Sequence, residues 1–296
     1  MVGTLEVSSK ELSDHLTSRR SLILFAIVYL IGISMSFEAI ASIRSEMQRS
    51  GGQYLFLRLF TTQYGVVPSF TGVLVFTGPL IGLLLVFDSV NRELSNGTLG
   101  NILSQPVHRD SVIIGKFIAG SLTSLLMLSG AFSIMVGMGI MNIGALPTFE
   151  EVLRITAYLL VSTVYLSLWV ALGLLYSIFF KREGTAALAS VATWLFFTLF
   201  IYMIIDITVT ANMFPFFSYI SPPFVYDQAA TALMIPEIRV TGPVSYERII
   251  GMLPNPLPFG QSVLLIWPHL VVLTSIMLVL FAVSYIKFVK QEIRST

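Results

Sequence analysis

The chain has 296 residues, of which 55% are hydrophobic and 11% are charged, and its mean hydropathy is +0.84. Soluble domains carry about 25% charged residues, so water cannot be the solvent for most of this chain. The net charge of +1 gives no reason to expect a nucleic-acid partner, and the lack of cysteine excludes disulfides, thiolate metal sites and cysteine nucleophiles.

Residues 4–20 form a basic lead-in whose leucines recur at near-helical spacing: Leu5, Leu12 and Leu16. Ser8 and Glu11 also have the spacing of a helix-capping box. We therefore expect an amphipathic helix that lies along the membrane surface, with its leucines in the interface and its charges in water. A solvated helical tail is the alternative.

Six long stretches free of charged residues follow. Charges are expensive in hydrocarbon, and a helix needs about 20 apolar residues to cross it. We therefore predict an all-α integral membrane protein that forms a single transmembrane domain over residues 1–296. Its six spans are expected at approximately residues 21–40, 66–88, 112–140, 155–180, 184–206 and 262–287.

Residues 207–261 are apolar in places but contain prolines, each of which removes a helix donor: Pro215, Pro222, Pro223, Pro254, Pro256 and Pro258. We expect a long loop with re-entrant helices here rather than a seventh span. The aromatic residues of this loop would either pack those helices or anchor the loop at the membrane interface.

The basic residues are distributed unequally between the two sides of such a membrane protein. Eleven of the 17 fall on the side that carries both termini, mostly close to helix ends, and the other six are spread over longer loops. The positive-inside rule therefore places both termini in the cytoplasm and the 207–261 loop outside.

Residues 89–111 form the longest predicted cytoplasmic loop, and they contain turn formers and helix caps. Gly97 suits a turn because glycine tolerates a positive φ. Leu99 and Leu103 would lie on the apolar face of a short helix, which Pro106 ends. A short apolar helix at the membrane surface suits docking to another protein; a plain connection between two spans is the alternative.

From residue 92 to residue 116 the sequence reads RELSNGTLGNILSQPVHRDSVIIGK, which resembles the cytoplasmic signature of ABC-2 type transporter permeases. The matching positions are Arg92, Glu93, Gly97, Thr98, Leu99, Leu103, Ser104, Pro106, Val107, Arg109, Ile114, Gly115 and Lys116. The six-span layout, the lead-in and the long last loop resemble this family as well. Gly100 departs from the pattern, since many relatives have glutamate there, so the contact with the partner is expected to differ in detail.

The resemblance implies a permease subunit of an ATP-driven transporter in the cell membrane, expected to be an exporter. Such subunits pair with a second copy or a paralogue, and the 89–111 loop of each docks as a coupling helix on a cytoplasmic ATP-binding subunit. The residues expected to make this contact are Arg92, Glu93, Gly97, Thr98, Leu99, Leu103 and Pro106. The chain itself should be non-catalytic and hold no cofactor, because ATP and Mg²⁺ belong to the partner.

The sequence agrees with the need for such a partner. A phosphate-binding G-x-x-x-x-G-K-[ST] motif is absent, because Gly115 and Lys116 are followed by Phe117 and lack the upstream glycine.

Small residues four positions apart predict close helix contacts in two spans. Gly78 and Gly82 form such a pair in the second span, and Gly173 and Ser177 form one in the fourth. These contacts would lie either within the subunit or across a dimer. Pro79 is expected to kink the second span, as a hinge or as a packing accommodation.

Two other classes of protein are alternatives. An ion-gradient-driven transporter or channel would need buried ionisable residues, and a membrane scaffold would need only the docking loop. His269 is the only histidine inside a predicted span, and a packing role for it is favoured over a proton or metal site. An enzyme is disfavoured, because no paired carboxylates or metal-spaced histidines occur in or near the spans. The apolar spans favour a hydrophobic or amphipathic cargo.

Overall fold

The computed structural model describes residues 2–50, 54–63, 68–97, 108–200, 203, 220–238 and 256–290. All regular structure within these ranges is helical. The helices in chain order are α1 (Val2–Thr17), α2 (Arg19–Ser50), α3 (Leu55–Thr61), α4 (Phe70–Val86), α5 (Asn91–Ser95), α7 (Arg109–Ile143), α8 (Phe149–Phe179), α9 (Glu183–Leu195), the π-helix η1 (Phe196–Phe200), α12 (Pro222–Met234) and α14 (Phe259–Lys290).

Six helical segments in the described part of the chain are long and apolar enough to cross a membrane: Arg19–Arg44, Phe70–Ser95, Arg109–Ile143, Phe149–Phe179, Glu183–Phe200 and Phe259–Lys290. The predicted all-α membrane fold with six spans is therefore confirmed. The first spanning helix, α2, is longer than the predicted span at residues 21–40, because it continues through the polar residues that follow the apolar run.

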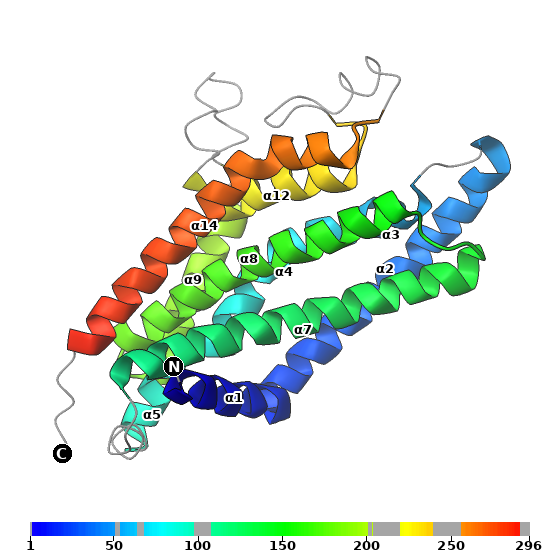
Figure 1. Ribbon diagram of the computed structural model, residues 1–296. Coiled ribbons are helices and arrows are strands. Elements are labelled where there is room, and N and C mark those ends of the chain that lie inside the picture. The colour runs from blue at the N-terminus through cyan, green and yellow to red at the C-terminus, as the bar shows by residue number, and fades with distance from the viewer. Residues whose placement is uncertain are drawn as a thin grey trace.

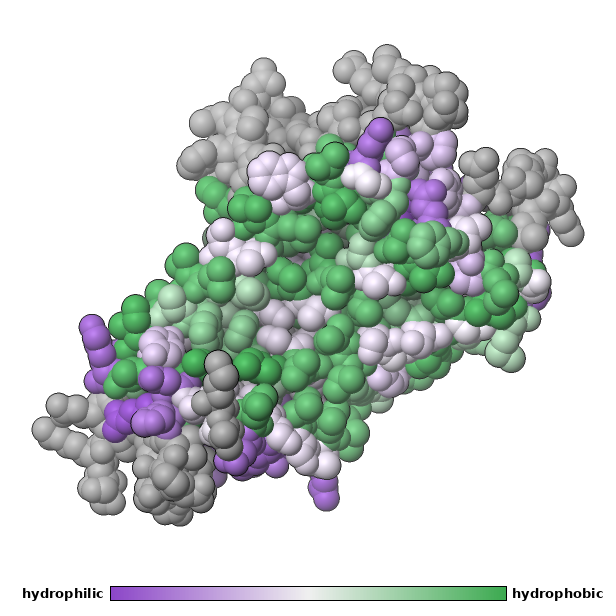
Figure 2. Space-filling view, viewed as in Figure 1, coloured by the Kyte–Doolittle hydropathy of each residue, from purple (hydrophilic) through white to green (hydrophobic). Residues whose placement is uncertain are grey.

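The long helices run side by side, and the short ones lie at the two ends of the bundle (Figure 1). Helices α1 and α5 and the last turns of α14 lie at one end, here called the α1 end. Helices α3 and α12 lie toward the other, here called the α3 end. Hydrophobic side chains cover the long helices between the two ends, and hydrophilic side chains gather at the ends themselves (Figure 2).

Helix α8 is the central element of the bundle. In its most apolar stretch 67% of the residues are buried, against 17% for α14 and for the α9–η1 segment, which turn most of their surface outward. Trp169 of α8 is completely buried. Since the outward-facing helices carry exposed leucines and valines, they fit a surface that faces lipid rather than water.

The small residues singled out in the sequence lie where α4 packs on α8. A Cβ atom at Gly78 would lie 2.8 Å from Cε1 of Tyr165, and one at Gly82 would lie 2.7 Å from the carbonyl oxygen of Leu166. A Cβ atom at Gly173 would lie 2.8 Å from a methyl carbon of Val86. At these three positions, then, the contact lies within the chain.

Ser177 does more than leave space. Its Oγ accepts hydrogen bonds from the backbone N–H groups of Val90, at 2.7 Å, and of Asn91, at 3.2 Å. One hydroxyl of α8 thus satisfies two N–H groups at the beginning of α5.

Pro79 removes a backbone donor inside α4, and aromatic side chains of neighbouring helices satisfy the carbonyls around it. The hydroxyl of Tyr165 in α8 donates to the carbonyl of Val75 at 2.9 Å. The indole N–H of Trp194 in α9 donates to the carbonyl of Phe76 at 2.8 Å. The packing of α4 against α8 and α9 therefore supplies hydrogen bonds to the carbonyls beside Pro79.

At the α3 end, a buried arginine joins three parts of the chain. The side chain of Arg154 in α8 pairs with Glu150 at 2.9 Å and donates to the carbonyls of Leu233, at 2.8 Å, and Leu257 and to the hydroxyl of Ser262, at 3.1 Å. Glu150 lies in α8 itself, and the other three partners come from α12, from the residues before α14 and from α14. We name Arg154 with these four partners the Arg154 cluster. Arg154 is one of the six basic residues that the sequence alone assigns to the longer loops.

Helix α3 is attached to the same region by Glu151. This carboxylate accepts a hydrogen bond from the backbone N–H of Phe56 at 2.8 Å, and it also accepts one from the backbone N–H of Thr148 in the capping box that begins α8. Helix α12, within the segment predicted as a loop with re-entrant helices, packs between α8, α14 and α4. The rest of residues 207–255, apart from α12 and the residues beside it, lies outside the described ranges.

Candidate functional site

Helix α1 packs against the first turns of α7 with its polar face inward. Gly115 makes this approach close, since a Cβ atom there would lie 2.6 Å from a methyl carbon of Val7. Glu11 and His15 are buried, whereas Leu5 is 72% exposed. The lead-in is therefore not a solvated tail: it is attached to the bundle through polar side chains and turns leucines outward, as an interfacial helix does.

The predicted capping box at Ser8 and Glu11 is wrong, because α1 already begins at Val2 and both residues lie inside it. The hydroxyl of Ser8 donates to the carbonyl of Thr4 at 2.8 Å. Glu11 turns toward α7 instead of capping its own helix.

The centre of the site is a buried ion-pair network around Lys116 of α7. Its Nζ lies 2.8 Å from Oε1 of Glu93 in α5 and 3.1 Å from Oε1 of Glu11 in α1. The side chain of Lys116 is only 2% exposed. A buried ammonium group is stable only with partners of opposite charge, so the network ties α1, α5 and α7 together.

A second ion pair connects α2 to the turn between α4 and α5. A guanidinium nitrogen of Arg20 lies 2.7 Å from the carboxylate of Asp88, and another donates to the carbonyl of Leu85 at 3.2 Å. Arg92 reaches the same carboxylate at 3.8 Å. The beginning of α2 and the exit from α4 are thus held together by charge.

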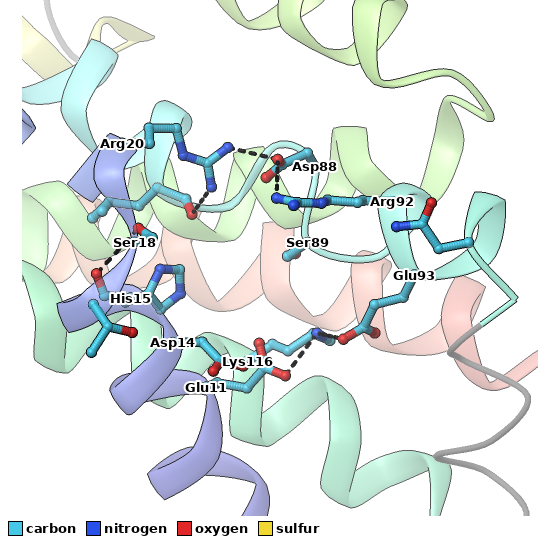
Figure 3. Close-up of a pocket in the computed structure, with 13 residues that line it drawn as sticks. Glu11, Asp14, His15, Ser18, Arg20, Asp88, Ser89, Arg92, Glu93 and Lys116 are labelled. Atoms are coloured by element: carbon cyan, nitrogen blue, oxygen red, sulfur yellow. Dashed lines mark hydrogen bonds and ion pairs between the residues drawn. The ribbon is translucent and has the colours of Figure 1, made fainter. Parts of the chain in front are cut away.

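The two ion-pair groups face each other across a pocket of ≈ 360 Å³ at the α1 end (Figure 3). Its charged and titratable lining residues, named here the Lys116 cluster, are Glu11, Asp14, His15, Arg20, Asp88, Arg92, Glu93 and Lys116. Segments far apart in sequence supply them, since they come from α1, α2, the α4–α5 turn, α5 and α7.

The two buried titratable groups of α1, Glu11 and His15, have shifted pKa values because of this environment. Burial alone would raise the pKa of the Glu11 carboxyl, but the ammonium groups of Lys116 and Lys10 outweigh burial and lower it. Burial lowers the pKa of His15; the carboxylate of Glu11 opposes this shift, and the positive charges of Arg20 and Lys116 add to it. Near neutral pH, Glu11 is therefore ionised and His15 neutral.

The residues predicted to contact an ATPase partner lie partly in this site. Arg92 and Glu93 belong to α5, and Gly97 follows in a turn with a φ of +71°, the left-handed conformation that favours glycine. Thr98, Leu99, Leu103 and Pro106 lie outside the described residues. The structure adds roles for Glu11, Arg20 and Asp88 that the sequence reading missed. Lys116 was the available signal, because a charge inside an apolar span needs a partner.

No group of three or more histidine, aspartate or glutamate side chains in the described ranges could hold a metal ion. The Lys116 cluster provides a mechanical connection: its side chains of opposite charge link several helices, among them α5 and α7, which flank residues 98–107 in the sequence. His269 is buried in α14, away from these residues.

Taken together, the six apolar helices define a multi-pass helical membrane protein. The model of the ABC-2 family transporter protein matches residues 5–293, so the chain belongs to the ABC-2 family of transporter proteins.

Two curated relatives carry the same printed name, "Probable ABC transporter permease protein NosY". The chain is 28% identical to the protein from Pseudomonas aeruginosa over 203 residues, which make up 65% of this chain and 66% of that protein. It is 30% identical to the protein from Stutzerimonas stutzeri over 134 residues, which make up 45% of this chain and 42% of that protein. The matches thus span just under two thirds of the first relative and less than half of the second.

Proposed function

We propose that this chain is the membrane-spanning permease subunit of an ATP-driven ABC exporter. It would couple ATP hydrolysis in a separate nucleotide-binding subunit to the movement of a substrate across the membrane. The membership of the ABC-2 family and the permease relatives support this class. The observation that carries the coupling role is the ion pair between Lys116 and Glu93.

This ion pair joins the two sides of the segment 98–107. Glu93 lies five residues before the segment and Lys116 nine residues after it, in α7, and their 2.8 Å contact brings the two flanks of the loop together. Because Glu11 shares the same ammonium group, a displacement of the loop would reach α1 and α7 together. Through Ser177 it would also reach α8, the central helix. Rigid helices that move as a unit are the usual means of switching access between two sides of a membrane.

The proposed partners follow from this arrangement. A cytoplasmic ATP-binding subunit would receive the loop through Arg92, Glu93, Gly97, Thr98, Leu99, Leu103 and Pro106, and it would bind the ATP and Mg²⁺. A second permease copy or a paralogue would complete the membrane part. The α1 end, which carries most of the basic residues, would face the cytoplasm, and the membrane would be the cell membrane. The chain itself would have no catalytic role.

The test is affinity purification from the native membrane, followed by mass spectrometry and an ATPase assay. A Walker-motif ATPase should co-purify with the wild type and should be lost from a Leu99→Glu, Leu103→Glu variant. Leu146→Glu is the matched control, because Leu146 is 76% exposed in the connection before α8 and its substitution should leave the ATPase attached. A wild type that purifies without any ATPase, or a double variant that retains it, would overturn the proposal.

An ion-gradient-driven transporter or channel is the second candidate, and one observation favours it. Asp227 of α12 is a partly buried carboxylate that lines a cavity among apolar helices, as coupling-ion sites often do. This reading predicts that the chain reconstituted alone conducts or exchanges ions. Flux that is absent from the wild type, or that persists unchanged in Asp227→Asn, would dismiss it.

A further inference from the structure

A second cavity lies toward the α3 end, apart from the Lys116 cluster. Its volume is ≈ 260 Å³, and it is lined by Gly72, Val75 and Phe76 of α4, Thr198 of η1 and Asp227 of α12. Three elements that are distant in sequence thus meet around one carboxylate. The remaining lining residues are one aliphatic, one aromatic and one hydroxyl side chain, together with a glycine.

The carboxylate of Asp227 has no partner among the described residues: none of them donates a hydrogen bond to it or forms an ion pair with it. The hydroxyl of Thr198, which lines the same cavity, donates to the carbonyl of Trp194 at 2.6 Å instead. The cation Arg154 is already occupied by Glu150 and three further oxygens. An ionised carboxylate without a partner is costly among apolar helices, so this position is suited to a positive charge supplied by a ligand.

One aromatic ring lines the same cavity as this carboxylate, and a second ring packs against the first. The ring of Phe76 lines the cavity and is in edge-to-face contact with the ring of Trp194, their centroids 5.1 Å apart. The hydrogen bond from the Trp194 indole to the carbonyl of Phe76 fixes this pair. Aromatic faces attract organic cations within about 6 Å, and they do so more strongly where water is excluded. A carboxylate and an aromatic pair at one cavity therefore match an alkylammonium group.

The size of the cavity limits what it can enclose. Pockets that bury whole drug-sized ligands measure about 300–1,000 Å³, so 260 Å³ accommodates a head group rather than a complete amphiphile. Phe76 is 40% exposed at the outer surface of α4, so an apolar tail would leave the cavity along this side and enter lipid. A Cβ atom at Gly72 would meet only Pro68 and Ser69, at 3.5 Å and 3.6 Å, and the glycine is therefore not required by tight packing.

We propose that this cavity binds the alkylammonium head group of an amphipathic molecule, with Asp227 as the counter-ion and Phe76, which Trp194 holds in place, as the aromatic wall. That this molecule is the transported cargo rests on the proposed function; that it binds does not. The cavity thus favours a cationic amphiphile, whereas the apolar spans alone favoured a hydrophobic or amphipathic cargo of unspecified charge.

The test uses two probes of nearly the same shape on the purified full chain in maltoside micelles. Trimethylammonium-diphenylhexatriene carries the cation, and diphenylhexatriene is its neutral counterpart. Energy transfer from the protein's tryptophans to each probe reports binding close to the protein. In Asp227→Asn the dissociation constant of the cationic probe should rise by about tenfold or more, as expected for a lost partner of a desolvated charge, while that of the neutral probe stays the same. Asp227→Glu should retain most of the affinity.

Equal affinity of the cationic probe for the wild type and for Asp227→Asn would overturn the proposal, as would an equal loss for both probes. If Asp227→Asn does not fold, judged by its elution and thermal unfolding, Phe76→Leu replaces it. This variant keeps the apolar volume but removes the aromatic face, so it should weaken only the cationic probe. Unchanged binding of that probe would then count as the negative result.

The outcomes also separate this proposal from the proposed function. Asp227-dependent binding without a co-purified ATPase would leave the site standing and dismiss the exporter. A co-purified ATPase, together with probe binding that ignores Asp227, would leave the exporter standing and dismiss the site.

Discussion

The two ends of the bundle each bury a cation, but they satisfy it differently. Lys116, at the α1 end, has a side chain that is 2% exposed and pairs with two carboxylates from two other helices. Arg154, at the α3 end, is fully buried and pairs with one carboxylate of its own helix, Glu150. Its other partners are neutral oxygens of α12, of α14 and of the residues before α14.

This difference suggests different mechanical roles. An ammonium group is a point charge on a flexible stem, and two acidic partners beside a pocket of ≈ 360 Å³ can exchange it as the helices move. A guanidinium group has a fixed planar geometry, and Arg154 uses it to hold several neighbours at once. The Lys116 cluster is thus suited to transmit motion, and the Arg154 cluster to keep α12 and α14 fixed on α8.

The largest expected effect comes from Arg154→Lys. A lysine keeps the charge but cannot reach the same set of oxygens, so buried carbonyls and part of the Glu150 pairing are lost, at a cost of about 3 kcal/mol or more. The apparent unfolding temperature in detergent should fall clearly. Arg44→Lys is the control, because Arg44 is exposed at the same end and should tolerate the change. An Arg154→Lys protein as stable as the wild type would contradict the assigned holding role.

Lys116→Met should release α1, because Glu11 and Glu93 would lose the buried cation that they share, and only the exposed Lys10 would remain beside Glu11. The chain lacks cysteine, so Val7→Cys can report the release as faster maleimide labelling, by about tenfold. Adding Glu11→Gln and Glu93→Gln removes all three charges and should restore slow labelling, since replacing every member of a buried network costs little. If the single and triple variants label at the same rate, charge does not hold α1.

Two glycines with positive φ, one toward each end of the bundle, allow the same backbone strain to be introduced at either end by substitution with alanine. Gly97, after α5, has a φ of +71°, and Gly144, after α7, has a φ of +75°; a Cβ atom would touch nothing within 4 Å at either position. Alanine should therefore cost about 1 kcal/mol at each through backbone strain alone. We expect Gly97→Ala to lower the coupled ATPase activity and Gly144→Ala to lower only the unfolding temperature. Equal effects of the two variants on ATPase activity would remove the distinction between the ends.

The smallest expected effect is a pH dependence confined to the α1 end. Burial lowers the pKa of His15, so the docked α1 favours the neutral imidazole and loses stability as the pH falls below the ordinary value of 6.5. The lowered pKa of Glu11 adds a further loss only below its ordinary value of 4.5. The groups that face His15 are Glu11, Arg20, Lys116 and Asp88.

Labelling at Val7→Cys, divided by labelling at an exposed Ser13→Cys, should therefore rise between pH 7 and pH 5.5. The rise should stay below about tenfold, because pH 5.5 lies only one unit below the ordinary imidazole pKa of 6.5. His15→Gln should flatten it. A rise that survives in His15→Gln would assign the dependence to another group.

The six spans could be predicted because the cost of placing charge in hydrocarbon is a local property of the sequence. The pairing of Glu11 with Lys116 could not, because the two residues are 105 positions apart and meet only when α1 packs on α7. Local spacing instead suggested a capping role for Glu11. Asp227 was overlooked for a related reason: the proline-rich connection around it was counted as a loop, so its carboxylate was not expected beside the apolar helix α4.

Ser177 has a consequence for the direction in which the chain leaves α4. Its one oxygen receives the N–H groups of both Val90 and Asn91, so the exit from α4 follows the orientation of α8. Helix α8 has 31 residues and is therefore about 45 Å long, and Arg154 lies near its other end. A rotation of α8 about its own axis would therefore displace the residues that leave α4. The same rotation would move Arg154, so α8 can link movements of α12 to movements of the segment that contains α5.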